Sequence, residues 1–185
     1  ANFFNQVQLE ATGADISATS LGNTVKGLNR DVTIRDIVST YIYPNTLKTL
    51  SVTRAQLKCA LERSAEYFAI GADGKLKVSE SFLTPIEQHF NYDYFSGIEA
   101  AFDIRRSVGD RVVSIKYNGE ELSGDKRLTL CMNNYRASGA GGYDVYRQCQ
   151  TVRELPTEIA ELIIAYVDKH RNITVDKHKW LKLIY

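Results

Sequence analysis

The spacing of hydrophobic residues predicts three helices, and the first residues of each helix mark where it begins. At Thr53-Arg54-Ala55-Gln56 a threonine precedes a glutamine by three positions, which is the pattern of a capping box. Apolar residues then recur at helical spacing, so we predict a helix from this point. A second helix is predicted from Thr33 to Pro44, and a third begins after Pro156-Thr157.

Alternating apolar and polar residues predict strands in the middle of the chain. The alternation covers residues 98–104 and 112–117, and Gly109 between them indicates a hairpin. Asn118-Gly119 is a strong turn signal, and it leads to a third apolar run at 128–132. We therefore expect these strands to form an antiparallel meander.

Other segments lack a sustained period. We expect the first twenty residues to be irregular, residues 71–91 to form a long loop and the basic stretch 177–182 to be a solvated terminus, whereas residues 47–52 read as a short extended piece. Helices and antiparallel strands occupy separate parts of the sequence. The predicted fold class is therefore α+β, a single domain with helices packed on an antiparallel sheet.

Composition narrows the function without defining it. The chain has 185 residues and a formal net charge of +1, so no overall field favours a nucleic-acid polymer or an anionic membrane. No apolar run approaches the roughly 18 residues that a membrane span requires. The cysteines Cys59, Cys131 and Cys149 are far apart, which predicts small buried residues or free thiols rather than a disulfide framework.

Two segments combine aromatic side chains with small polar residues near predicted strands. They cover residues 91–97 and 133–143. Glycines in the second segment permit backbone conformations and close ligand approach that a side chain would forbid. One ring from each segment could hold a nucleotide base by stacking. The alternative is that these tyrosines are buried anchors with solvated hydroxyls.

The sequence contains no complete catalytic site. Its three histidines are His89, His170 and His178, and no zinc-protease, serine-hydrolase or phosphate-loop motif is present. The pairs Asp168-Lys169-His170 and Asp176-Lys177-His178 favour solvated surface, because residues two apart on a helix point in different directions.

Four ordered motifs together carry a family resemblance. The chain resembles the C-terminal domain of the 5'-nucleotidase family, and within it the bacterial 2',3'-cyclic-nucleotide 2'-phosphodiesterase/3'-nucleotidase branch. The resemblance implies that two aromatic residues, matched here to Tyr92 and Tyr135, sandwich the base. The motifs are Glu10-Ala11-Thr12-Gly13-Ala14-Asp15-Ile16-Ser17, Tyr43-Pro44-Asn45-Thr46-Leu47, Asn91-Tyr92-Asp93 and Asn133-Asn134-Tyr135-Arg136-Ala137-Ser138-Gly139.

Two departures from the 5'-nucleotidase pattern bear on the substrate. Ser17 stands where that pattern has an arginine, and Gly141 stands where it has an aspartate. Both suit a phosphate on the ribose 2' and 3' oxygens. We expect Arg63 and Arg136 to contact sugar or phosphate, and Asn91, Asp93 and Asn134 to bind the base edge or fix the loops. The expected substrate-binding set is Tyr92, Tyr135, Asn91, Asp93, Asn134, Arg136, Arg63, Gly139 and Gly141.

The resemblance also implies what the chain does not contain. Residues 1–185 would be the substrate-binding domain, and two divalent metal ions would be held by a separate N-terminal catalytic domain. The expected partners are a 2',3'-cyclic or 3'-nucleotide and that catalytic domain, and the location is extracytoplasmic. The isolated chain is expected to be inactive. The alternatives are a 5'-nucleotidase, a nucleotide-sugar hydrolase, or a stand-alone nucleotide-binding or interaction module.

Overall fold

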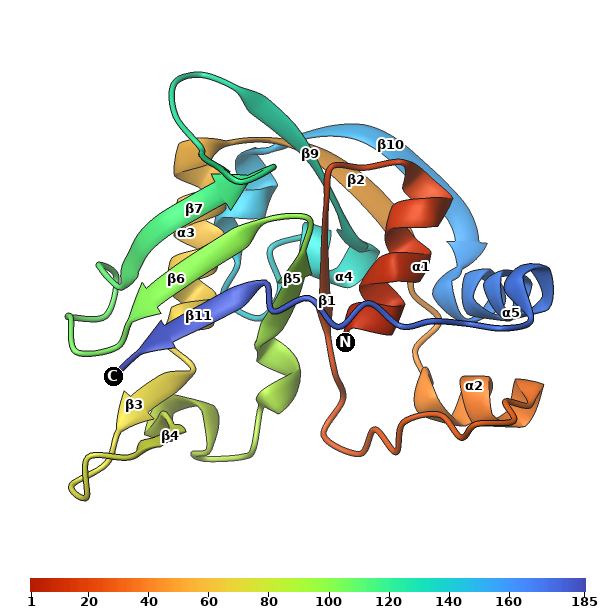
Figure 1. Ribbon diagram of the computed structural model, residues 1–185, viewed down its shortest axis with the longest axis horizontal. Coiled ribbons are helices and arrows are strands. Elements are labelled where there is room, and N and C mark those ends of the chain that lie inside the picture. The colour runs from red at the N-terminus through yellow and green to blue at the C-terminus, as the bar shows by residue number, and fades with distance from the viewer.

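The computed structural model describes residues 1–185 and combines a five-stranded sheet with a smaller four-stranded sheet and covering helices (Figure 1). The strand orders are β10-β2-β9-β1-β5 and β11-β6-β7-β8, and β3 pairs with β4. The strands are β1 (Ile16–Ser20), β2 (Thr46–Thr53), β3 (Phe68–Ile70), β4 (Leu76–Val78), β5 (Asp93–Ser96), β6 (Glu99–Asp103), β7 (Val112–Tyr117), β8 (Glu120–Glu121), β9 (Arg127–Asn133), β10 (Gln150–Glu158) and β11 (Leu181–Ile184). The helices are α1 (Asn2–Thr12), α2 (Ile34–Thr40), α3 (Arg54–Ala65), α4 (Asn134–Ala137) and α5 (Ile159–His170), with short 3-10 turns η1 (Glu80–Phe82), η2 (His89–Asn91) and η3 (Asp144–Gln148).

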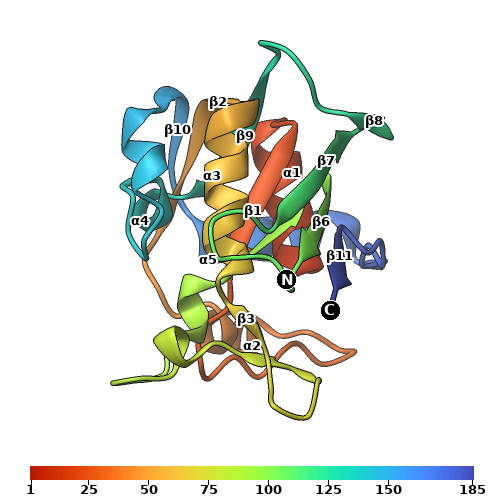
Figure 2. The same ribbon diagram turned by 90° about the vertical axis from the view of Figure 1, so that its left-hand side faces the viewer.

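The core consists of two hydrophobic clusters on opposite faces of the five-stranded sheet. Figure 2 shows helix α3 running alongside strand β2 of that sheet. Strand β2 shows the division, because Leu50 and Val52 belong to the larger cluster and Leu47 to the smaller one. The larger cluster lies between this sheet, helix α3 and the four-stranded sheet, and the smaller one packs against α1, α2 and α5. The predicted α+β class is confirmed. None of the helices combines the length and apolar character needed to cross a membrane.

The predictions that rest on local signals are confirmed. The Thr53 side chain caps α3, and its backbone N–H donates to Gln56 Oε1 at 2.9 Å. Asn118 and Gly119 have φ angles of 52° and 83°, as a tight turn between β7 and β8 requires. All three cysteines are free thiols. Helix α2 begins after Thr33 as expected but ends at Thr40, before Pro44 is reached.

The prediction that the first twenty residues are irregular is wrong, because they form α1 and β1. Polar residues on the buried face of α1 hide its amphipathic pattern. Asn5 is fully buried, and its side chain accepts from Ser17 Oγ at 2.8 Å and donates to Ser96 Oγ at 3.1 Å. Hydrogen bonds from α1 to the sheet thus accompany the hydrophobic contacts of Phe4 and Val7.

Three further expectations are corrected by long-range pairing. Strands β6 and β7 form the expected hairpin, but β9 joins the five-stranded sheet between β2 and β1, so there is no three-stranded meander. The stretch 71–91 contains β4 and two 3-10 turns. The basic tail continues into β11, which pairs in parallel with β6, so the terminus is part of a sheet rather than merely solvated.

Candidate functional site

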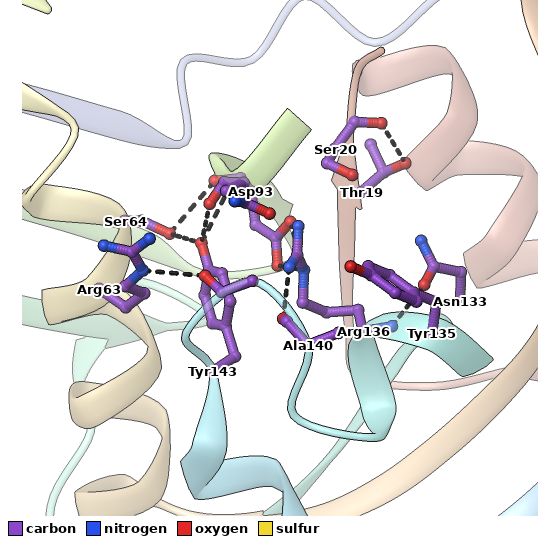
Figure 3. A network of polar contacts seen from close by, with 12 residues as sticks. Thr19, Ser20, Arg63, Ser64, Asp93, Asn133, Tyr135, Arg136, Ala140 and Tyr143 are labelled. Carbon is purple, nitrogen blue, oxygen red and sulfur yellow. Dashed lines mark hydrogen bonds and ion pairs between the residues drawn. The ribbon is translucent and has the colours of Figure 1, made fainter. Parts of the chain in front are cut away.

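A cavity of about 340 Å³ opens between the segment after β1, the end of α2 with the loop that follows it, and the start of α4. We refer to it as the main cavity. Its volume falls in the range of small-molecule sites. Figure 3 shows Ser20, Asn133 and Tyr135, which lie on this side of the domain. The lining residues are Phe4, Ser20, Gly22, Thr24, Val25, Ser39, Thr40, Tyr41, Ile42, Tyr43, Asn45, Phe90, Asn133 and Tyr135.

Two tyrosines on different segments give the main cavity its exposed aromatic surface. Tyr43, just after α2, is 48% exposed, and Tyr135, in the first turn of α4, is 52% exposed. Neither ring is paired with another aromatic ring of the chain. Half-exposed rings that line a cavity without an aromatic partner are suited to stacking on a planar ligand.

The lining of the main cavity carries no acidic or basic side chain and no histidine. Its polar groups are hydroxyls and amides, with Tyr41, Asn45 and Asn133 forming one polar corner. Burial raises the pKa of Tyr41 to about 12, although the amides of Asn45 and Asn133 act in the opposite direction. The Tyr41 ring is held edge-on against Phe4 with the ring centroids 5.7 Å apart. Such a site suits an uncharged aromatic group better than a phosphate.

The position of Tyr135 follows from capping of α4. Asn133 ends β9, and its Oδ1 accepts from the backbone N–H of Arg136 at 2.6 Å, which begins the helix. Asn134 fixes the same turn to β2, because its Oδ1 accepts from the Thr46 backbone N–H at 3.2 Å. Asn134 is thus a structural tie and does not line the main cavity.

Arg136 and Asp93, both expected at the substrate, form a buried ion pair (Figure 3). Arg136 Nε lies 2.9 Å from Asp93 Oδ2. The guanidinium also donates to the carbonyls of Ala140 at 2.6 Å and Phe90 at 2.7 Å, and it lies over the Tyr143 ring at 4.5 Å. Because each of its three guanidinium nitrogens has a hydrogen-bond partner within the chain and its side chain is buried, Arg136 holds the walls of the site together, and the expectation of a substrate contact is corrected.

The glycine loop accommodates arginines instead of a ligand. Gly141 has a φ of 76°, and a Cβ there would lie 1.9 Å from Arg136 Nη1. Gly139 has a φ of 89°, and its Cβ would lie 2.6 Å from Arg147 Nε. Neither glycine lines the main cavity. The close approach that we expected for a ligand is made by guanidinium groups of the same chain.

Arg63 and Asn91 also have structural partners. Arg63 Nε donates to the Gly141 carbonyl at 3.0 Å, Nη1 lies 2.5 Å from Glu66 Oε2, and the guanidinium stacks 4.4 Å above the Phe82 ring. Asn91 is buried, and its Nδ2 donates to Gln88 Oε1 at 2.7 Å. Neither side chain reaches the main cavity.

The structure does not bring Tyr92 and Tyr135 together. Tyr92 is only 6% exposed, stacks on Tyr67 at a centroid distance of 4.7 Å, and meets Phe68 and Tyr94 edge-on. It borders a separate cavity of about 300 Å³ beneath β11, which Asp93 also lines. Because Tyr92 is buried and Tyr67 already stacks on its ring, the expectation that Tyr92 stacks on a base is corrected.

Sequence reasoning missed the other residues of the main cavity, above all Tyr41, Tyr43, Asn45 and Asn133. The signal was present at Tyr43, which stands in one of the four family motifs and follows the apolar residues Ile34, Val38 and Ile42. All three of these side chains are exposed, so these apolar residues of α2 and of the loop after it do not pack into the core. No group of three or more His, Cys, Asp or Glu side chains is arranged to hold a metal ion.

Comparison with known proteins assigns the domain. The family model described as the C-terminal domain of 5'-nucleotidase matches residues 1–148. The chain therefore belongs to the 5'-nucleotidase C-terminal domain family. A solved Staphylococcus aureus protein, assigned as a 5'-nucleotidase and bound to alpha-ketoglutarate, is 37% identical with a TM-score of 0.93, over 100% of this chain and 36% of that one. The 5'-nucleotidase precursor of Thermus thermophilus is 18% identical, with a TM-score of 0.78 over 99% of this chain and 34% of that one, and shares the fold.

Two curated relatives are much longer than this chain. The trifunctional nucleotide phosphoesterase YfkN of Bacillus subtilis is 24% identical over 160 residues, which is 77% of this chain and 10% of that protein. The 2',3'-cyclic-nucleotide 2'-phosphodiesterase/3'-nucleotidase of Haemophilus influenzae is 29% identical over 125 residues, 58% of this chain and 18% of that protein. The chain thus spans a small part of these relatives.

Proposed function

We propose that this chain is the substrate-binding domain of a metal-dependent nucleotide phosphoesterase and that it holds the base of the nucleotide between Tyr43 and Tyr135. The observation that carries the proposal is that two half-exposed tyrosines line one uncharged cavity. Base stacking on an aromatic side chain contributes about 1–3 kcal/mol per base. Two such contacts would supply about 2–6 kcal/mol of the roughly 8 kcal/mol that micromolar affinity requires, so polar contacts to the nucleotide must supply the rest.

Because the lining of the main cavity is uncharged, we assign base binding to this chain and phosphate chemistry to a second domain. A phosphate placed in the main cavity would lose water without gaining a cationic partner, so the phosphate should extend out of it. We place bond cleavage in a second, N-terminal domain, where two divalent metal ions would activate water and stabilise the displaced oxygens. This chain would supply orientation, using contacts remote from the reacting bond. Alone it would bind nucleotides without hydrolysing them.

For the substrate we propose a 2',3'-cyclic or 3'-nucleotide. Ser17 and Gly141 replace the arginine and aspartate expected in a 5'-nucleotidase, and relatives from Haemophilus influenzae and Yersinia enterocolitica carry the name of the cyclic phosphodiesterase. An extracytoplasmic location is part of this proposal. A 5'-nucleotidase is the second candidate, because the Staphylococcus aureus protein assigned to that activity is 37% identical. Comparing turnover of 2',3'-cyclic AMP and 5'-AMP by the full-length protein decides between them.

Calorimetry of this chain with 2',3'-cyclic AMP, 3'-AMP and 5'-AMP in EDTA tests the binding role. Replacing Tyr43 or Tyr135 with Ala should weaken binding about ten- to hundredfold, because each removes one stacking face. Tyr185→Ala is the matched control, since Tyr185 is also exposed but lies outside the main cavity. Its affinity should equal that of the unchanged chain. Equal affinity in all three variants would refute the aromatic clamp, and hydrolysis by the purified chain would refute the division into two domains.

A further inference from the structure

The orientation of the Asn133 side chain is fixed by its role at α4. Its Oδ1 accepts from the Arg136 backbone N–H, so the amide cannot turn over without breaking the helix cap. The two N–H donors of Nδ2 must then point the other way. Figure 3 shows the nitrogen of Asn133 directed away from α4. Because Asn133 lines the main cavity and is only 9% exposed, Nδ2 lies at the cavity wall beside the Tyr41 hydroxyl, and a donor that Tyr41 does not use is available to a ligand.

Tyr41 adds a hydroxyl donor to the same corner. It is 8% exposed, lines the main cavity and lies beside the amides of Asn45 and Asn133. When an amide N–H donates to the phenol oxygen, the phenol proton remains free for another acceptor. No carboxylate lines the cavity to accept these donors. A ligand that reaches the corner must bring an acceptor, or buried donors are left unpaired.

We propose that Asn133 is a specificity-determining residue that donates an N–H from Nδ2 to a ring nitrogen or carbonyl oxygen on the edge of the bound base. The inference rests on the proposed function, because it requires a base in the main cavity. Tyr43 and Tyr135 would hold the faces of any base, and stacking alone is tolerant of base identity. The donor at Asn133 then selects the base edge that carries a correctly placed acceptor.

The test compares Asn133→Asp with Asn134→Asp. Asn133→Asp keeps the oxygen that caps α4 but replaces the donors with a second acceptor. Asn134→Asp adds the same charge one residue away, keeps the oxygen that accepts from Thr46, and lies outside the cavity. Asn133→Ser is the uncharged companion, since serine also caps helices. Binding of adenosine, cytidine, guanosine and uridine, and of their 3'-monophosphates, is measured by calorimetry in EDTA, with thermal unfolding as a check on folding.

Asn133→Asp and Asn133→Ser should weaken binding of the preferred nucleoside about tenfold or more, and Asn134→Asp should leave it within about threefold. Nucleosides are included because they have no phosphate for the new carboxylate to repel. Removing the complementary acceptor, as in 1-, 3- or 7-deazaadenosine, should weaken binding to the unchanged chain but not to Asn133→Ser. Tight binding that survives in folded Asn133→Asp and Asn133→Ser would overturn this inference and leave the proposed function intact. Absence of binding to the unchanged chain would overturn both.

Discussion

Arg136 Nε lies 2.9 Å from Asp93 Oδ2, and the two side chains are only 2% and 1% exposed. Burial raises the pKa of Asp93 to about 6, with the guanidinium opposing that effect, so the carboxylate is ionised at neutral pH. Arg136 also binds the carbonyl of Phe90, which belongs to a residue lining the main cavity. A buried charge pair therefore sits directly behind the proposed nucleotide site.

Removing one member of this pair should cost far more than removing an exposed one. Arg136→Met leaves a carboxylate buried without its partner, and we expect a loss of about 3–5 kcal/mol in the free energy of unfolding. The control is Arg171→Met, because Arg171 and its partner Asp168 are both 82% exposed. That variant should change stability by less than about 1 kcal/mol. Urea unfolding measures both, and equal losses would contradict a structural role for the buried pair.

We expect position 141 to require glycine, because the Arg136 guanidinium lies where a Cβ would be. Gly141→Ala combines an unfavourable φ of 76° with a Cβ 1.9 Å from Arg136 Nη1. Gly74→Ala is closely matched, since Gly74 has a φ of 74° but nothing within 4 Å of the added carbon. The control should lose only the backbone cost, about 1–2 kcal/mol. Thermal unfolding of Gly141→Ala should show a clearly larger loss, and similar midpoints would mean that the guanidinium moves aside freely.

Local signals in the sequence predicted the parts of the fold that depend on neighbouring residues. Some signals depend only on residues a few positions apart, so they can be recognised without the tertiary structure. Examples are the capping box at Thr53 and Gln56 and the turn at Asn118 and Gly119. Strand β10 was missed because its edge position leaves most of its side chains exposed, which removes the alternation that marks a strand.

The site was harder to predict because the sequence does not distinguish a buried tyrosine from an exposed one. Tyr92 and Tyr43 both stand in family motifs, and an asparagine lies within two positions of each. Only the packing of Tyr67 and Phe68 around Tyr92 shows which ring is structural. Similarly, a glycine loop looks the same whether a ligand or an arginine approaches it, so Arg136 could not be assigned from composition.

The carboxylate of Asp15 should make stability depend on pH in acid. Burial works against ionisation, but hydrogen bonds from Thr129 and Tyr117 outweigh it and lower the pKa of Asp15 below the ordinary value of 3.8. Oδ2 accepts from the Thr129 backbone N–H at 2.7 Å, and Oδ1 accepts from the Tyr117 hydroxyl at 2.8 Å. A lowered pKa in the folded state gives stability that is present above the ordinary pKa and is lost as pH falls below it.

Asp15→Asn removes this dependence. At neutral pH the variant should be less stable by about 1–3 kcal/mol, because an uncharged amide replaces the carboxylate that accepts the hydrogen bonds from Thr129 and Tyr117. As pH falls below about 4 the difference from the unchanged chain should shrink, because the unfolded chain then binds a proton at Asp15 more readily than the folded chain does. Chemical unfolding at several pH values measures the difference. A gap that stays constant down to pH 2 would show that the charge of Asp15 contributes nothing.

Substitutions of Tyr92 and Tyr135 should affect different properties: loss of the Tyr92 ring should lower stability, and loss of the Tyr135 ring should weaken nucleotide binding. Tyr92→Ala removes a ring that is 6% exposed and packed against Tyr67 and Phe68, so we expect a loss of about 3–5 kcal/mol in the free energy of unfolding. Tyr135→Ala removes a ring that is 52% exposed, and its stability should change by no more than about 0.5 kcal/mol. Nucleotide affinity, measured where both variants are folded, should follow the opposite order.

Tyr92→Phe keeps the packed ring and should resemble the unchanged chain in both measurements. Weakened binding by a stable Tyr92→Phe would show that the Tyr92 hydroxyl contacts the ligand and would contradict a purely structural role for this residue.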